Sequence, residues 1–269
     1  MDRFNIMSDP KYKDLQYMKD KIILLGLSGS HSYGTNNENS DIDIRGIQYN
    51  PIDVLLGLEK ESQYISPTTD TTVYHLNKVI PLLANCNPNI LEMLGLAEED
   101  YIIVSPVGRQ LIDNVDMFLS KDAIKSAFGG YARAQLKRLK NGESDGHGQK
   151  KDDNHLCKHA MHLMRLLISG RNILTTGKVR TRMDGLQLEF LKKIRRGDYF
   201  QNGRMVDRFY NLVEAEENTL NDIYNKSKLP EKPDWNRIRK FLIDVNYKTV
   251  LREVGTVCQL KVDFQKNSV

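Results

Sequence analysis

One segment near the start of the chain, residues 29–45, constrains the fold more than any other. It reads Gly-Ser-His-Ser-Tyr-Gly-Thr-Asn-Asn-Glu-Asn-Ser-Asp-Ile-Asp-Ile-Arg and comes soon after an apolar run, residues 22–25. Short apolar or alternating runs bounded by Gly, Ser and Asn are typical of strands, so we expect strands over residues 22–28 and 41–49. A Gly-Ser loop after a strand offers backbone N–H groups and a hydroxyl, which suit phosphate oxygens.

Two acidic residues, Asp41 and Asp43, lie in the second expected strand. Alternate side chains of a strand share a face, so the two carboxylates should point the same way, roughly 7 Å apart, while Ile42 and Ile44 point into a core. Hard divalent cations take oxygen ligands, and such a pair is a suitable site for them. Each short pattern alone is weak evidence, but a phosphate loop beside a metal site indicates phosphoryl or nucleotidyl transfer.

The string that contains both patterns resembles a known superfamily. Gly29-Ser30 followed by Asp41-Ile42-Asp43 is similar to the signature of DNA polymerase beta-type nucleotidyltransferases. The longer pattern resembles one branch, the RNA-repair-associated polymerase beta family found beside RNA ligases. That pattern is Gly29-Ser30-x3-Gly34-Thr35-x4-Ser40-Asp41-x-Asp43-x-Arg45-Gly46. Residues 87–94 and 158–167 agree with it, and the resemblance runs from about residue 22 to about residue 200.

The resemblance implies a metal-dependent nucleotidyltransferase. Such an enzyme moves an NMP from an NTP, with ATP expected, to an acceptor hydroxyl. Asp41, Asp43 and a third acid would be the catalytic residues and the ligands of two Mg²⁺ ions. The implied nucleotide-binding residues are Gly29, Ser30, Gly34, Thr35, Ser40, Arg45, Lys158, His162 and Arg165.

The expected acceptor is an RNA end. One alternative is AMP transfer to a protein hydroxyl, as in antitoxin-like members of the superfamily. A binding protein without catalysis is the other alternative, and the presence of the Gly-Ser pair and of both acids argues against it.

The third acid is expected at Asp70, between an expected strand at residues 63–66 and an expected helix over residues 72–85. Asp is also a common helix N-cap, which is the alternative role for Asp70. Glu92 is the other candidate acid, or else a residue that braces its loop. Arg45 could orient a neighbouring carboxylate, contact the nucleotide or form a salt bridge.

A helix expected over residues 154–169 has a cationic stripe. At 100° per residue, Lys158, His162 and Arg165 fall within about 60° of one another, opposite an apolar face. The stripe resembles the basic element that grips the triphosphate in the wider superfamily, and a solvated helix face is the alternative. A zinc site with Cys157 is not expected, because its side chain would project about 140° away from His162.

The fold is expected to be α+β. A small mixed-sheet nucleotidyltransferase domain over residues 1–120 should be followed by a basic helical domain over residues 121–269 that closes the nucleotide cleft. The expected helices cover residues 89–96, 107–118, 121–140 with a break at Gly129-Gly130, 154–169 ending at Gly170, 184–196, 207–226 and 234–253. Residues 141–153 are polar and glycine-rich and should form a mobile loop.

Charge divides the chain unevenly. Residues 1–120 carry 9 Lys/Arg and 17 Asp/Glu, whereas residues 121–269 carry 30 Lys/Arg and 18 Asp/Glu. An acidic half that binds metal and a basic half that meets the phosphates of an NTP or a nucleic acid would explain this difference. The most basic short segment, residues 192–196, could favour its helix dipole or contact an acceptor's phosphates.

No run of eighteen apolar residues is present, so no membrane partner is expected. The N-terminus lacks the basic start and apolar core of a signal peptide. Cys86, Cys157 and Cys258 are odd in number and widely spaced, so they indicate no disulfide framework. These features lead us to expect a cytoplasmic protein.

Overall fold

The computed structural model describes residues 5–140 and 152–266, with side chains up to residue 255. The loop expected at residues 141–153 therefore lies outside the described residues, apart from its last two positions. The strands are β1 (Ile22–Ser28), β2 (Asp43–Gln48), β3 (Gln63–Ile65), β4 (Thr71–His75), β5 (Tyr101–Val104), β6 (Phe200–Gln201) and β7 (Arg204–Met205). The helices are α1 (Lys13–Tyr17), α2 (Gly29–Tyr33), α3 (Ile52–Leu55), α4 (Leu76–Ala84), α5 (Pro88–Leu91), α6 (Pro106–Asp113), α7 (Lys121–Lys140), α8 (Asp153–Thr176), α9 (Gly185–Arg196), α10 (Asp207–Lys226) and α11 (Trp235–Lys266).

A five-stranded mixed sheet organises the first half of the chain. Its strand order is β3-β4-β2-β1-β5, in which β2 and β4 are parallel and the other neighbours are antiparallel. Strand β1 is buried along its whole length, as its apolar run predicts. The expected α+β class with a small mixed sheet is confirmed.

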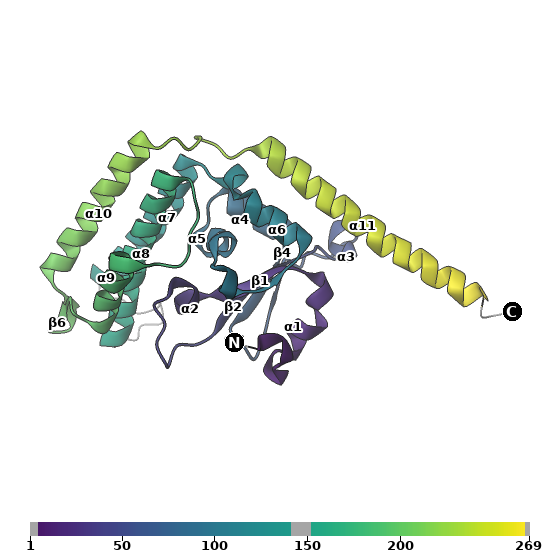
Figure 1. Ribbon diagram of the computed structural model, residues 1–269, viewed down its shortest axis with the longest axis horizontal. Helices are drawn as coiled ribbons and strands as arrows, with labels where there is room; N and C mark the ends of the chain where they lie inside the picture. Colours follow the sequence, from purple (N-terminus) through teal and green to yellow (C-terminus); the bar gives the residue numbers. More distant parts are fainter. Residues whose placement is uncertain (1–4, 141–151, 267–269) are drawn as a thin grey trace.

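The sheet is covered on both faces. Leu25 and Leu27 of β1 pack with an N-terminal segment that includes Tyr12 and Leu15. Ile23 and Leu24 instead join a larger apolar cluster that continues through α4, α6, α7 and α8 (Figure 1). One continuous core therefore connects the sheet to the helices that follow it.

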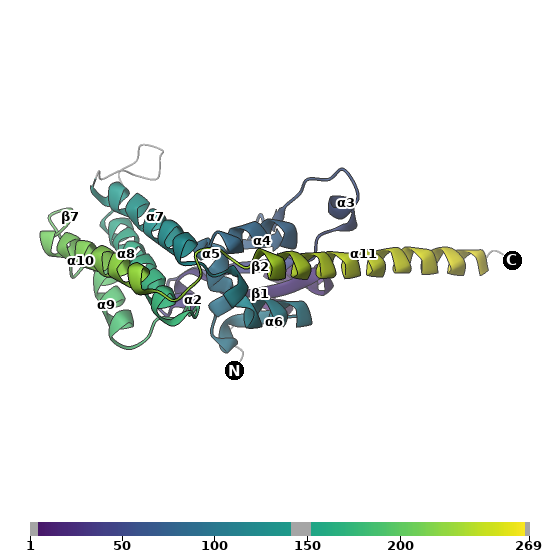
Figure 2. The ribbon, with the colours of Figure 1, turned by 90° about the horizontal axis from the view of Figure 1, so that it is seen from above.

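The helical part is built around α8, which contacts α7, α9 and α10. Figure 1 shows these four helices beside the sheet, with α2 facing them. After α10 the chain returns, and α11 contacts α3 and α4 of the first half. Figures 1 and 2 show α11 crossing over the first half and extending away from it. Within the described part of the chain, no helix is both long and apolar enough to cross a membrane.

The helix expected over residues 72–85 is wrong in its first turn. Residues 71–75 form strand β4, and α4 begins only at Leu76. Burial alternates along β4, with Thr71, Val73 and His75 buried, which is the period of a strand. Val73 and Leu76 are also three residues apart, so a helical period fitted the same residues.

One expected helix end and one expected helix break are also wrong. Helix α8 continues through Gly170 and ends at Thr176, where Gly177 caps it with a left-handed φ of 66°. Gly170 serves packing instead, since a Cβ there would lie 2.9 Å from the Cβ of Phe128. Helix α7 likewise runs through Gly129-Gly130 without a break.

The remaining boundaries shift in smaller ways. The last helix extends to Lys266. The helices expected over residues 89–96 and 107–118 each divide into an α-helix and a 3-10 turn. Strand β2 begins at Asp43, so Asp41 precedes the strand.

Candidate active site

The sheet register brings two aspartates together. In the parallel pair β2–β4, Ile44 lies opposite Thr71, and the Ile44 N–H donates to the Asp70 carbonyl at 2.8 Å. Asp43 and Asp70 each precede these residues by one position, so they are neighbours at the start of adjacent strands. Because Asp70 precedes a strand, its alternative role as a helix N-cap is wrong.

The loop after β1 lies against the same carboxylates. Ser28 pairs with Asp43 across the antiparallel β1–β2 ladder. Gly29 follows with a φ of +62°, and a Cβ at this position would lie 1.9 Å from Asp43 Oδ2. Only glycine allows the start of α2 to approach the carboxylate this closely.

The end of α2 turns the chain back toward the pocket. Gly34 has a left-handed φ of 76°, and the Thr35 N–H donates to the Ser30 carbonyl at 3.0 Å. Thr35 lines the pocket, and its hydroxyl is buried without a hydrogen-bond partner among the described residues. A buried hydroxyl of this kind fits an oxygen of a bound ligand.

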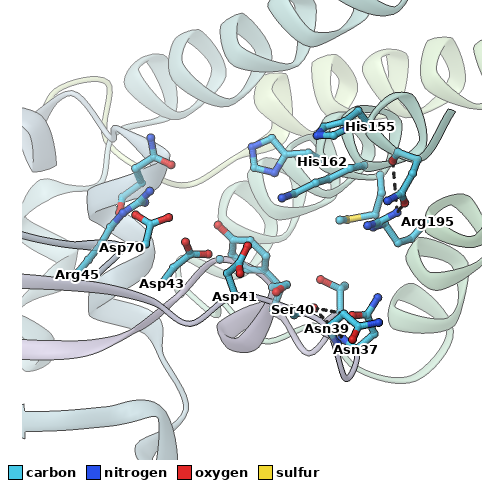
Figure 3. A pocket seen from close by; sticks show the side chains of 18 residues that line it. Asn37, Asn39, Ser40, Asp41, Asp43, Arg45, Asp70, His155, His162 and Arg195 are labelled. Carbon is cyan, nitrogen blue, oxygen red and sulfur yellow. Dashed lines mark hydrogen bonds between the residues drawn. The ribbon is translucent and has the colours of Figure 1, made fainter. Parts of the chain in front are cut away.

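These elements and helices α8 and α9 enclose a pocket of about 530 Å³. Figure 3 shows Asp41, Asp43 and Asp70 on the sheet side, and His155, His162 and Arg195 on the helical side. The lining residues are Gly29, Ser30, Tyr33, Thr35, Asn37, Asn39, Ser40, Asp41, Asp43, Arg45, Asp70, Asn89, Asn154, His155, Lys158, Met161, His162 and Arg195. An acidic side therefore faces a basic side across one cavity.

Most residues expected at the site line this pocket. The exceptions are Gly34, which shapes the turn after α2, and Arg165. Sequence reasoning missed four asparagines that line the pocket, Asn37, Asn39, Asn89 and Asn154. The asparagine-rich run at residues 36–39 was the one available signal for the first two.

The neighbouring Asp70 carboxylate perturbs Asp43. Burial, and then the hydrogen bond and charge of Asp70, raise the pKa of Asp43 to about 6. Arg45 and Lys158 lower the pKa of Asp43 in part. Arg45 lies two residues after Asp43 on β2. It also donates to the Asn89 carbonyl at 3.4 Å, which holds its guanidinium near Asp43.

The donor set on the acidic side fits a divalent cation. Asp43 and Asp70 form a like-charge pair in which the pKa of Asp43 is raised, and a cation would relieve their repulsion. Asp41 lines the pocket from an exposed position just before β2. Among the side chains of residues 5–140 and 152–255, however, no group of three or more His, Cys, Asp or Glu residues is already close enough to hold a metal ion.

The expected place of Arg165 on the triphosphate-facing stripe is corrected. Its side chain is only 1% exposed, lies outside the pocket lining and forms an ion pair with Glu92. The guanidinium also stacks on the Tyr33 ring, 3.7 Å from its centroid. Arg165 points beneath the pocket because Glu92 and Tyr33 hold it there, whereas Lys158 and His162 reach the cavity.

Glu92 is therefore a bracing residue, and its alternative role as the third metal-binding acid is wrong. Its carboxylate accepts from Tyr33 Oη at 3.0 Å and from Arg165. Its backbone carbonyl accepts from the Thr181 hydroxyl at 2.5 Å. Glu92 thereby connects α2, α8 and the segment before α9 behind the pocket.

The chain was compared with solved structures, with curated proteins and with protein-family models. It is similar to a crystal structure of a nucleotidyltransferase-like protein from Exiguobacterium sibiricum, with 12% identity over 96% of this chain and 89% of that chain. The TM-score is 0.28, which is too low for the two folds to be compared. The comparison with curated proteins gave no match. The sequence model of the RNA repair pathway DNA polymerase beta family matches residues 7–244, a longer span than the motifs alone covered. With that match over most of its length, the chain belongs to the RNA repair pathway DNA polymerase beta family.

Proposed function

We propose that this chain is a nucleotidyltransferase that transfers an NMP from an NTP to a hydroxyl at an RNA end. One observation carries the proposal. Strand register sets Asp43 beside Asp70 on one side of a pocket whose opposite side presents Lys158 and His162. A cavity with paired carboxylates facing cationic and hydrogen-bonding groups suits a metal-bound triphosphate.

The acidic side would hold Mg²⁺ through Asp41, Asp43 and Asp70. Bound Mg²⁺ would lower the pKa of the acceptor hydroxyl and neutralise charge on the phosphates. Arg45 keeps a positive charge close to Asp43 and so favours its ionised form. Because Gly29 has no Cβ, the start of α2 leaves room for the Asp43 carboxylate.

The phosphates would lie between the loop after β1 and helix α8. Ser30 and Thr35 line this part of the cavity and offer hydroxyl groups. Lys158 faces them from α8, and its ammonium would stabilise the charge that develops on the departing pyrophosphate. ATP is the first NTP to test.

An RNA acceptor is supported by the charge around the pocket entrance. Arg195 lines the pocket from the last turn of α9, and its neighbours Lys193 and Arg196 are exposed. Residues 121–269 carry 30 Lys/Arg against 18 Asp/Glu. Such a surface binds nucleic acid phosphates with a strong dependence on salt.

The test is transfer from ATP labelled at the α-phosphate, in the presence of Mg²⁺. The acceptors are an RNA with a 3′-hydroxyl, the same RNA blocked by a 3′-phosphate, and protein. Asp43→Asn serves as the inactive control. We expect label on the unblocked RNA alone, with RNA binding that weakens steeply as salt rises. Label on protein alone would mean that the acceptor is a protein hydroxyl and not an RNA end. The absence of label from every acceptor with each of the four NTPs would overturn the proposed function.

A further inference from the structure

The buried Arg165 meets a pocket residue on its own helix. Arg165 Nη2 lies 3.4 Å from His162 Nδ1, one turn of α8 away. A guanidinium carries only hydrogen-bond donors, so Nδ1 must be the acceptor in this contact. A neutral imidazole has one donor and one acceptor nitrogen. The hydrogen of His162 therefore lies on Nε2, the ring nitrogen that remains for the pocket.

Arg165 cannot turn away from this contact without disrupting the interior. Its guanidinium is fully buried, is ion-paired with Glu92 and stacks on Tyr33. Tyr33 in turn donates its hydroxyl to the second oxygen of Glu92. The donor that faces His162 is therefore held by two residues, Glu92 and Tyr33, from separate parts of the chain.

We propose that Arg165 is a positioning residue that fixes His162 as the Nε2–H tautomer, so that His162 offers one hydrogen-bond donor to a phosphate oxygen of the nucleotide. This inference rests on the proposed function for the identity of the ligand. Because Nε2 carries the hydrogen, His162 cannot act there as a general base or bind a metal ion. Its role differs from that of Lys158, which brings a full positive charge one turn earlier on α8.

The surroundings of His162 support a neutral ring. Burial, followed by the positive charge of Arg165, holds the pKa of His162 well below its usual range. His159 and Lys158 from α8, and Arg45 from β2, act in the same direction. The Glu92 carboxylate is engaged by Arg165 and Tyr33. A neutral donor thus lies in the pocket at neutral pH.

His155 provides a contrast within the same helix. Its Nδ1 lies 2.8 Å from Asp152 Oδ1. A carboxylate can only accept, so Nδ1 of His155 carries a hydrogen. The two histidines should therefore differ in the state of the same ring nitrogen.

The first test is nitrogen NMR of the ¹⁵N-histidine-labelled, nucleotide-free protein, with signals assigned from His162→Gln and His155→Gln. We expect His162 to show an unprotonated Nδ1 and a protonated Nε2 between pH 6 and 8, while His155 shows a protonated Nδ1. A protonated Nδ1 at His162 would overturn the inference. This readout needs no nucleotide and no transfer activity.

The second test is equilibrium binding of ATP to wild type, His162→Gln and His162→Ala. The glutamine amide places an N–H near the former Nε2, whereas alanine has no donor. We expect affinity to fall about tenfold in His162→Ala and to stay within about threefold of wild type in His162→Gln, since a hydrogen bond to a charged group is lost only in the first. Equal affinity in both variants would overturn the donor role. Failure of the wild type to bind any NTP would instead overturn the proposed function and the donor role together, and the tautomer would still be decided by NMR.

Discussion

Replacing Arg165 by methionine tests how much the buried network behind the pocket contributes to stability. The side chains of Arg165 and Glu92 are 1% and 8% exposed. Methionine keeps much of the arginine's apolar volume, but it leaves the Glu92 carboxylate buried with the Tyr33 hydroxyl as its remaining side-chain donor. The dominant effect should therefore be an uncompensated buried charge.

The expected loss is about 4 kcal/mol, since removing one partner of a buried ion pair costs about 3–5 kcal/mol. The chain offers a control in Arg109–Glu98, which is also an Arg–Glu ion pair but has side chains that are 43% and 71% exposed. Arg109→Met should cost far less than Arg165→Met, because water screens an exposed pair.

The assay is urea unfolding of Arg165→Met, Arg109→Met, Glu92→Gln and the double variant Glu92→Gln/Arg165→Met. Glutamine removes the charge yet still accepts the Tyr33 hydrogen bond, so the double variant should recover at least about 2 kcal/mol. If Arg165→Met proves no more destabilising than Arg109→Met, the reasoning about burial is refuted. If the stability loss of the double variant equals the sum of the Glu92→Gln and Arg165→Met losses, the uncompensated charge is not the cause.

Four further predictions concern the pocket. Asp43→Asn should abolish transfer without destabilising the metal-free protein, because burial and Asp70 raise the pKa of Asp43 to about 6 and the neutral amide removes a disfavoured charge; a lowered unfolding midpoint would contradict this. For the same reason, wild-type transfer at limiting Mg²⁺ should increase as pH rises through about 6, since the carboxyl must lose its proton to bind metal; a flat profile from pH 5 to 7 would count against metal binding by Asp43. Gly29→Ala should abolish transfer, because its Cβ would lie 1.9 Å from Asp43 Oδ2 at a φ of +62°; Gly130→Ala, which meets no atom within 4 Å, is the control. Lys158→Ala should weaken ATP binding measured by calorimetry, whereas Lys226→Ala, on an exposed helix end, should not.

The sequence alone determined the features that depend on neighbouring residues. The apolar run at residues 22–28 could be recognised as a buried strand, and Gly29-Ser30 as the loop after it. Asp41 and Asp43 are two residues apart, and local alternation predicted a shared direction; both line the pocket, although Asp41 precedes β2 instead of lying within it. Ile42 and Ile44 pack into one core, as that alternation requires. Lys158 and His162 share a helical face, and both reach the cavity.

The tertiary structure decided the features that depend on distant residues. The neighbour of Asp43 was settled by the register between β2 and β4, which pairs Ile44 with Thr71. Arg165 lies on the same helical face as His162, yet an acid 73 residues away turns it into the interior. Periodicity shows which side of an element is apolar. It does not identify the distant charged residue that packs against that element. Burial of a charge depends on that partner, because only a paired charge can be taken out of water at tolerable cost.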